Sequence, residues 1–457
     1  MICVDRLSAD DLVILWPDAV WPQEIGALAI LDGGPLLDAD GAVRVDEVRS
    51  WIGARLHRVP RLRQVIEYPR RGLGRPLWVD APGFDLDRHI GVSPVRPPGD
   101  EAALVAMVQV LLRRRLDRGR PLWELWLLPG LPGDRVGLFI RLHHVVADGV
   151  AGLSTLVDLL DPTPEPNPPR WRPLPPPTAR ELLRDNIRDR AATARRRLRR
   201  AVRPARRSRG ARPAGSGPIG LLTTPSPPRT SLDREVGAGR TVGLIRADLG
   251  AVHAVARRAG ATVNDVLLTA VAGGLAAVLR DRGESTTGLR LPVYVPVSLR
   301  PVAERVHARG NRIGQMVVPL PLDVDDPLRR LALIAGATGA AKEQDHPDLG
   351  SWLSGRLARR LLLAFLRTHP VSVTTADIPG PAQALQLAGA PITELFGVLP
   401  LISRVTVGVC ALSYRDRLSI TVVADRATLP DLGLFTEAAR RDLRALCDPV
   451  PVGPAGH

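Results

Sequence analysis

The 457-residue sequence has few cysteines, and their spacing argues against two kinds of site. Cys3, Cys410 and Cys447 lie far apart and form no Cys-x-x-Cys pair. Disulfide frameworks and structural zinc sites are built from several cysteines at characteristic spacings. We therefore expect a protein of a reducing compartment, without a metal site.

Long apolar runs are also lacking. The longest covers residues 266–279 and is interrupted by Gly273 and Gly274, whereas a membrane-spanning helix needs about 20 apolar residues. The first six residues lack the basic region and apolar core of a signal peptide. The sequence therefore predicts a cytoplasmic protein.

Lysine is nearly absent, so arginine carries the positive charge, and it does so unevenly. Lys342 is the only lysine, and the formal net charge is +15. Residues 178–213 hold 14 arginines but only three acidic residues (Glu181, Asp185 and Asp189), which leaves about +4 for the remainder. This distribution concentrates the charge in one segment.

The basic segment has three possible uses. A helix over residues 179–202, with leucines among its arginines, suits an anionic membrane surface or a lipid droplet. A solvated linker is the alternative. Nucleic acid is not expected, because no aromatic residues interleave with the arginines to stack bases. We therefore expect peripheral attachment to the inner face of the plasma membrane.

Proline-rich and glycine-rich stretches divide the chain. Residues 161–177 and 203–228 have the composition of linkers, and the chain is long enough for two domains with cores of their own. We predict an N-terminal lobe over residues 1–160, a linker over 161–233 and a C-terminal lobe over 234–457.

The pattern with the clearest chemistry follows an apolar run at residues 136–142. This run predicts a strand, paired with residues 122–128, and it ends in His143-His144. Asp148-Gly149 follows, and then an apolar helical pattern. Histidine can accept a proton at neutral pH, so we predict His144 as a general base at the end of a strand. A structural pair of core histidines is the alternative.

The neighbours of His144 have predicted supporting roles. His143 would orient the loop, and Asp148 would fix it through an arginine. Gly149 would let a backbone N–H approach a ligand closely and would open the helix.

His143-His144-xxx-Asp148-Gly149 resembles the motif of the wax ester synthase/diacylglycerol acyltransferase family. That family is related to chloramphenicol acetyltransferase and to peptide-synthetase condensation domains. Other matching segments favour the lipid enzymes, and the resemblance covers roughly residues 7–160 and 235–446. These segments are Pro121-Leu122-Trp123, Asn264-Asp265 and Pro379-Gly380-Pro381.

The resemblance implies an α/β (α+β) fold with two chloramphenicol-acetyltransferase-like lobes. Each lobe would be a mixed sheet with helices, and a crossover linker would join them around a tunnel that the acyl chain and CoA enter from opposite mouths. The implied reaction moves an acyl group from acyl-CoA to diacylglycerol or a fatty alcohol. The sequence has no Gly-x-Ser-x-Gly elbow, so we expect direct transfer without an acyl-serine. No cofactor is implied beyond acyl-CoA as co-substrate.

Five further residues are candidates for substrate contact, each with an alternative. Trp123 is more easily explained by packing, and Asn264 and Asp265 equally well by capping of a helix. Arg300 is a candidate partner for Asp148. Asp377 stands where the family usually has Asn, which replaces an amide by an acceptor-only carboxylate.

Two other functions remain open from the sequence. One is acylation of a hydroxyl or amine on a specialised metabolite. The other is a catalytically silent lipid-binding paralogue, which Asp377 slightly favours and the intact His144 argues against. The sequence does not predict the acceptor, the acyl chain length or the oligomeric state.

Overall fold

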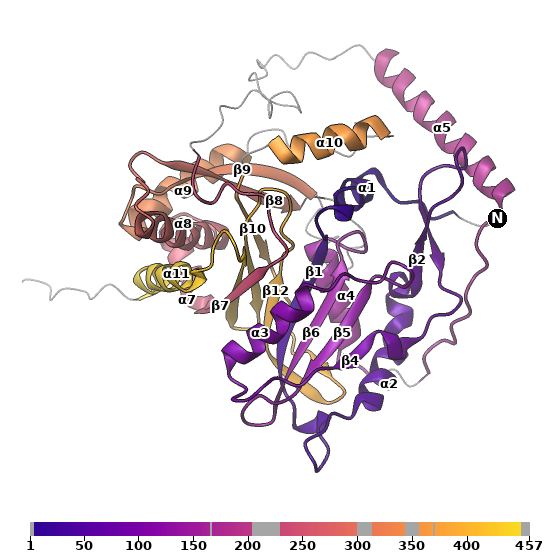
Figure 1. The fold of residues 1–457 in the computed structure, drawn as a ribbon, viewed down its shortest axis with the longest axis horizontal. Helices are drawn as coiled ribbons and strands as arrows, with labels where there is room; N and C mark the ends of the chain where they lie inside the picture. The colour runs from indigo at the N-terminus through magenta and orange to yellow at the C-terminus, as the bar shows by residue number, and fades with distance from the viewer. Residues whose placement is uncertain are drawn as a thin grey trace, which may run out of the picture.

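The computed structural model describes residues 4–164, 167–202, 229–298, 313–342, 356–368 and 371–448. Two six-stranded sheets stand side by side, one in each lobe, and helices cover them (Figure 1). Both sheets are mixed, since each contains parallel as well as antiparallel pairs. This is the predicted fold class.

The three longest strands of the N-terminal sheet, β12, β1 and β6, lie side by side at its centre. Its order is β11 (Gln386–Leu387), β12 (Ala390–Val398), β1 (Glu24–Asp32), β6 (Arg135–His143), β5 (Trp123–Leu128) and β4 (Ile90–Val92). The predicted hairpin between β5 and β6 is confirmed, with Trp123 opposite Leu142.

Helices and short turns surround this sheet. The helices are α1 (Ala9–Leu15), α2 (Val45–Arg55), α3 (Glu101–Leu112) and α4 (Gly149–Leu160). Short 3₁₀ helices cover Pro17–Ala19, Gly34–Leu36, Leu56–Arg58, Pro60–Arg63 and Leu86–Arg88, and a separate hairpin joins β2 (Gln64–Glu67) to β3 (Leu77–Asp80).

The sheet of the C-terminal lobe is built from its own half of the chain. Its order is β7 (Arg240–Asp248), β14 (Arg417–Asp425), β13 (Val407–Tyr414), β10 (Val373–Ile378), β8 (Arg290–Ser298) and β9 (Ile313–Pro321). The helices of this half are α7 (Leu249–Arg258), α8 (Val263–Asp281), α9 (Pro327–Lys342), α10 (Arg356–Thr368) and α11 (Leu432–Cys447).

One lobe boundary differs from the prediction. Residues 234–457 were expected to form the C-terminal lobe, but β11 and β12 lie in the sheet of the N-terminal lobe, where β12 pairs with β1. A two-residue turn at Ala388 and Gly389, both with positive φ, joins the two strands. Burial of Leu395 and Phe396 stabilises β12 in this sheet, because neither side chain is accessible to solvent there. We call this crossing of β11 and β12 into the N-terminal lobe the strand exchange.

Helix α8 is the one helix within the described segments that is long and apolar enough to cross a membrane. It packs against α9 and α11, and 78% of its most apolar window is buried. Its length and apolar character therefore serve the core of the C-terminal lobe.

The predicted linker contains α5 (Ala179–Val202), which has the predicted bounds. Figure 1 shows α5 beside the β2–β3 hairpin of the N-terminal lobe. The side chains of α5 are described as far as Arg195.

Candidate active site

The two histidines stand where β6 ends, at the seam between the lobes. The backbone N–H of His144 donates to the carbonyl of Gln23 at 2.7 Å, so the start of β1 holds the turn. The side chain of His144 is half-buried and lines a cavity, while that of His143 is only 3% exposed.

His143 supports the turn from inside. Its Nδ1 accepts a hydrogen bond from the Val145 N–H at 3.0 Å, so Nε2 carries the proton of the neutral ring. Nε2 lies 3.0 Å from Oδ1 of Asp18, which Arg118 also contacts. Burial, and then the Arg118 charge, lower the pKa of His143 to about 4. The ring is therefore neutral at physiological pH and faces away from the cavity.

Asp148 begins helix α4. Its carboxylate is 2% exposed and caps the helix by accepting the Ala151 N–H at 2.9 Å. The arginine predicted as its partner, Arg300, lies outside the described residues. The capping bond already fixes the Asp148 side chain at the turn.

Gly149 lets the two lobes approach each other. A Cβ at this position would lie 2.9 Å from Cδ1 of Ile378 in β10. A larger residue would require the end of the Ile378 side chain to move. The glycine thus allows close contact between the start of α4 and the Ile378 side chain beside His144.

The cavity that His144 lines lies between the lobes. One wall comes from β1, β6, β12 and α4 of the N-terminal lobe, and the other from β8, β10 and β13 of the C-terminal lobe. Most of the lining is apolar, and the ionisable side chains are His144, Asp148, Asp377 and Cys410. The main apolar lining residues are Ile25, Ile140, Leu142, Val150, Leu153, Leu156, Ile378, Leu399 and Leu412.

Asp377 faces His144's cavity from the opposite lobe. Its side chain is accessible from the cavity but enclosed by protein on most sides, and this desolvation raises its pKa to about 6. Near neutral pH a fraction of Asp377 is therefore protonated. A protonated carboxyl can donate a hydrogen bond, which a carboxylate cannot do.

Comparisons with known proteins identify the family. The catalytic-domain model of the wax ester synthase/diacylglycerol acyltransferases matches residues 7–267, and the model of the C-terminal domain of these enzymes matches residues 309–447. The chain belongs to this family.

Relatives of this acyltransferase in Mycobacterium tuberculosis H37Rv match nearly its whole length. The protein named probable diacylglycerol O-acyltransferase tgs1 is 30% identical over 90% of this chain and 88% of its own. A second relative from that strain, also named as a diacylglycerol O-acyltransferase, is 32% identical over 93% of this chain and 92% of its own.

Solved structures show the same two-lobed fold. The wax ester synthase/diacylglycerol acyltransferase of Marinobacter aquaeolei VT8 superposes with a TM-score of 0.67 at 22% identity, over 96% of this chain and 98% of that chain. The first condensation domain of the calcium-dependent antibiotic synthetase gives 0.63 at 16% identity, over 97% and 96%. Family membership makes the chain an acyl-CoA-dependent O-acyltransferase.

Three residues given as candidate substrate contacts in this acyltransferase, Trp123, Asn264 and Asp265, do not line this cavity. Trp123 is 1% exposed, stacks on His89 and donates its indole N–H to the carbonyl of Leu62 at 2.8 Å. These contacts make it a packing residue, because the side chain is buried and its indole N–H already has a partner.

Asp265 and Asn264 lie in the first turn of α8, away from the cavity lining. Asp265 forms a capping box with Thr262 and accepts a hydrogen bond from Thr338 at 2.7 Å. The capping alternative therefore explains Asp265. Oδ1 of Asn264 is buried and has no hydrogen-bond partner within the described part of the chain.

Two supporting residues of the acyltransferase site had no signal in the sequence. Asp18 and Gln23 hold the two histidines, yet both lie more than 100 positions before them. No group of three or more His, Cys, Asp or Glu residues that could hold a metal ion occurs in the described ranges.

Proposed function

We propose that this acyltransferase moves a long-chain acyl group from acyl-CoA to the hydroxyl of diacylglycerol or of a fatty alcohol, with His144 as the general base. The observation that carries this proposal is the place of His144, the histidine that lines an apolar cavity between the lobes. An apolar cavity with a few converging polar groups suits a lipid substrate.

The reaction needs one base and one site for negative charge. His144 takes the proton of the acceptor hydroxyl, and the oxygen attacks the thioester carbonyl carbon. When the C–S bond breaks, His144 returns the proton to the CoA thiolate. Helix α4 begins at the cavity wall beside Gly149. The first N–H groups of a helix lack partners within the helix, so they suit the oxyanion of the tetrahedral intermediate.

Asp377 then acts as a hydrogen-bond donor to the substrate in its protonated form. Its raised pKa, about 6, supports this role, because the neutral carboxyl offers the O–H that the family's usual amide offers as N–H. The departure from the family pattern is thus chemically smallest below about pH 6, where the neutral carboxyl predominates.

Replacement of the base tests the proposed mechanism. His144→Ala should lower ester formation about 10²–10⁴-fold, the usual contribution of a general base. Purified protein would receive labelled palmitoyl-CoA with diacylglycerol, a long-chain alcohol or a polar metabolite alcohol or amine, and the products would be separated by thin-layer chromatography.

His253→Ala is the matched control, since His253 lies exposed on α7 and should leave turnover unchanged. Circular dichroism would show that both variants are folded. Unchanged turnover by His144→Ala would reject the mechanism. Activity on the polar acceptors alone would favour a specialised-metabolite substrate, and activity on no acceptor would favour a lipid-binding paralogue.

The second part of the proposal is attachment to an anionic membrane or lipid-droplet surface on the cytoplasmic side, through α5. One face of α5 docks on the N-terminal lobe. Asp185 pairs with Arg6 at 2.5 Å, Asn186 donates to the Gly72 carbonyl at 2.6 Å, and Asp189 lies 3.6 Å from Arg75. The acidic residues of α5 thus face the protein or are half-buried.

The opposite face of α5 carries arginines and two exposed apolar side chains. Arg180, Arg184 and Arg190 are exposed, as are Leu183 (46%) and Ile187 (58%). Arginines around an exposed apolar pair are the pattern of a helix that lies on an anionic lipid surface.

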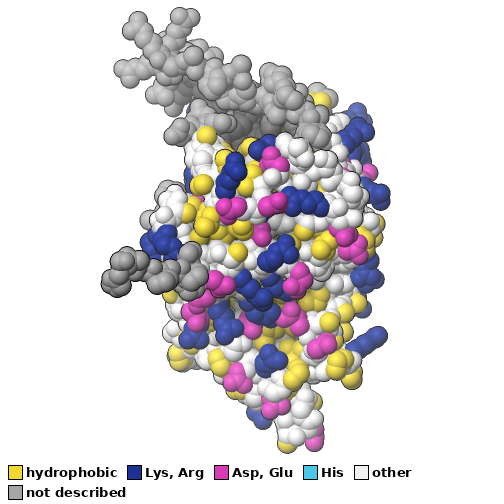
Figure 2. Space-filling model, turned by 90° about the vertical axis from the view of Figure 1, so that its left-hand side faces the viewer, with side chains coloured by type: hydrophobic (Ala, Val, Ile, Leu, Met, Phe, Trp, Pro, Cys, Tyr) yellow, Lys and Arg dark blue, Asp and Glu magenta, His cyan; other side chains and the backbone are white. Residues whose placement is uncertain are grey.

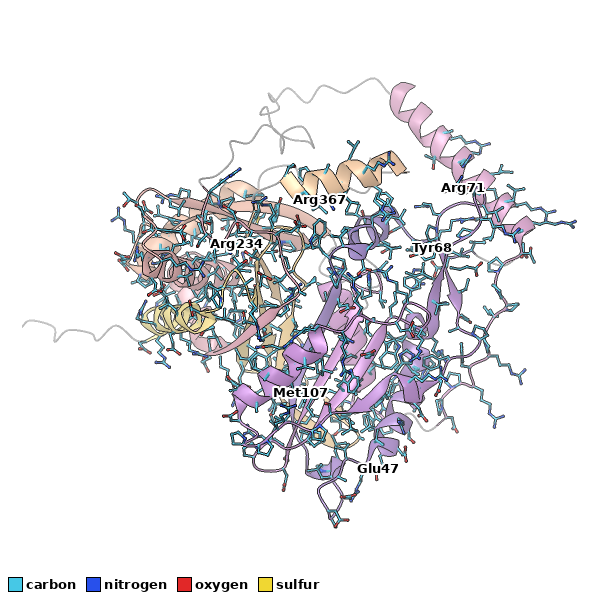
Figure 3. All side chains as sticks on the ribbon, in the orientation of Figure 1. Glu47, Tyr68, Arg71, Met107, Arg234 and Arg367 are labelled. Carbon is cyan, nitrogen blue, oxygen red and sulfur yellow. The ribbon has the colours of Figure 1, made fainter. Side chains whose placement is uncertain are left out.

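Helix α10 lies on the same side of the molecule (Figure 1). Residues 359–368 include three arginines and no acidic residue, and Leu361 is 59% exposed. Figure 3 shows Tyr68 and Arg71 beside α5, and Arg367 at α10, all on this side. Figure 2, by contrast, shows charges of both signs interspersed over the face of the C-terminal lobe.

Charge reversal on α5 tests membrane attachment. Arg180→Glu/Arg184→Glu should weaken co-sedimentation with vesicles that contain phosphatidylglycerol at least about tenfold, since each arginine near such a surface contributes about 1 kcal/mol. Arg257→Glu/Arg258→Glu on α7 changes the net charge equally at exposed positions of the C-terminal lobe and should have little effect. Equal binding by both variants would reject attachment through α5.

A further inference from the structure

A second cavity adjoins the catalytic cavity, and Leu399 lines both. We name it the arginine cavity, because Arg113, Arg115 and Arg240 contribute to its wall together with Trp21 and Glu24. It lies between the end of α3 and the start of β7, so residues of both lobes form it.

The arginine cavity reaches the turn that carries the catalytic histidine. Pro22 and Glu24 line it, and Gln23, which lies between them, accepts the backbone N–H of His144 at 2.7 Å. The same short segment therefore forms the wall of one cavity and supports the base of the other. A flexible molecule could occupy both cavities at once.

The one acidic residue that lines the arginine cavity does not neutralise its positive charge. Its one acidic side chain, Glu24, accepts the Leu116 N–H at 2.8 Å and lies 3.4 Å from the buried Arg141. Arg113 is exposed and has no hydrogen bond or ion pair from its side chain to any other described residue.

The other cations of the cavity leave charge available. Arg240 donates to the carbonyls of Gly237 and Gly239, and its nearest carboxylate, Asp425, lies at 3.9 Å. A fourth guanidinium, that of Arg367, lies 5.7 Å from the ring centroid of Trp21 in the cavity wall. The cavity therefore presents a net positive charge to whatever enters it.

The two cavities have complementary chemistry. The catalytic cavity is mainly apolar, and its acidic members, Asp148 and Asp377, would repel an anion. Acyl-CoA has the corresponding two parts, an apolar acyl chain at the thioester and several phosphate charges at the far end of a flexible pantetheine arm. Arginine is the residue best suited to phosphate groups.

From this match we propose that the arginine cavity binds the phosphate groups of acyl-CoA while the thioester lies beside His144. This inference rests on the proposed function, because it assumes an acyl-CoA donor. It assigns Arg113 as a determinant of affinity for the donor, acting through charge and remote from the reacting bond.

A donor without phosphates separates this role from catalysis. For Arg113→Glu, kcat/KM with palmitoyl-CoA should fall about tenfold, mainly through KM, and the loss should shrink at high ionic strength. With palmitoyl-pantetheine, which lacks the phosphates, kcat/KM should not change. Arg114→Glu is the matched control: the side chain is exposed one position further on, outside the cavity lining, and carries the same charge.

Binding of free CoA, followed by calorimetry, keeps the test independent of ester formation. Weaker CoA binding by Arg113→Glu but not by Arg114→Glu would support the inference even if no acceptor were acylated, in which case the proposed function alone would fail. Equal losses with palmitoyl-CoA and palmitoyl-pantetheine, or equal CoA binding by both variants and the wild type, would overturn it.

Discussion

The two lobes have sheets of the same size, but they are completed in different ways. All six strands of the C-terminal sheet come from residues 240–425, whereas the N-terminal sheet needs β11 and β12 from the other half of the chain. The N-terminal lobe, which carries His144, therefore depends on the second half of the chain to complete its sheet. The exchange also places the end of β12 in the wall of the catalytic cavity. Folding of the second half is thus a condition for an assembled site.

The largest expected effect comes from separating the halves. A fragment that ends at residue 215 lacks β12, whose Ile392, Leu395, Phe396 and Val398 are at most 2% exposed. Their burial contributes about 6–12 kcal/mol, at about 1.5–3 kcal/mol each. This equals most of the stability of an ordinary domain. We expect residues 1–215 alone to aggregate and to regain activity when co-expressed with residues 216–457.

Solubility, and cooperative unfolding followed by circular dichroism, would measure this difference. Residues 216–457 retain a complete sheet and should be the more soluble fragment. If residues 1–215 alone unfolded cooperatively, the N-terminal lobe would not depend on β12.

The exchange of β12 also shows the limit of what the sequence predicts. The β5–β6 hairpin and α4 follow from apolar periodicity and a turn, because each of these elements is specified within about 30 residues. Strand β12 pairs with β1 across more than 350 residues, and no local pattern encodes such a pairing. Even the two-residue turn at Ala388-Gly389 would have predicted only the hairpin and not its sheet.

The site divides in the same way. The motif around His144 is local, so the sequence placed His144, Asp148 and Gly149 together, and the structure has all three in the cavity lining. Asp18 and Gln23 support the histidines through the tertiary fold alone. The sequence around Asp265 suits a helix cap and an active-site residue equally well. The hydrogen bonds of Asp265 with Thr262 and Thr338 favour the cap.

A smaller effect should come from one buried, ion-paired arginine in each lobe. Arg141 (1% exposed) pairs with Glu124 at 2.8 Å and lies 3.4 Å from Glu24, and Arg330 (3% exposed) pairs with Asp442. Removal of one partner leaves a buried charge without compensation, which costs about 3–5 kcal/mol. Arg141→Ala and Arg330→Ala should each lower the free energy of unfolding in urea by that amount.

The two variants should differ in activity. Glu24 stands opposite His143 in the β1–β6 ladder, so loss of Arg141 should disturb the histidine turn and reduce kcat several-fold under conditions where the protein is folded. Arg330 lies in the core of the C-terminal lobe, where its loss should leave kcat nearly unchanged. Equal kcat for both variants would show that the turn does not depend on the ion pairs behind it.

The smallest predicted difference between the lobes concerns pH. His143 has a folded-state pKa of about 4 against 6.5 in the unfolded chain. Between these values the unfolded state binds more protons, so stability falls as the pH falls from 6.5 towards 4, by about 2 kcal/mol at pH 5. Asp377 of the C-terminal lobe has the opposite sign, since its pKa is raised from 3.8 to about 6. It adds stability as the pH falls from 6 to 3.8.

Free energies of unfolding at pH 7 and pH 5 would separate the two contributions. His143→Asn keeps an acceptor for the Val145 N–H but cannot titrate, so its loss of stability on acidification should be smaller than that of the wild type. Asp377→Asn should show a larger loss, because the compensating carboxyl is gone. His253→Asn, at an exposed position of α7, should follow the wild type. If His143→Asn lost as much stability on acidification as the wild type, the pKa of His143 would not be lowered in the folded protein. Burial beside Arg118 would then not keep the ring neutral.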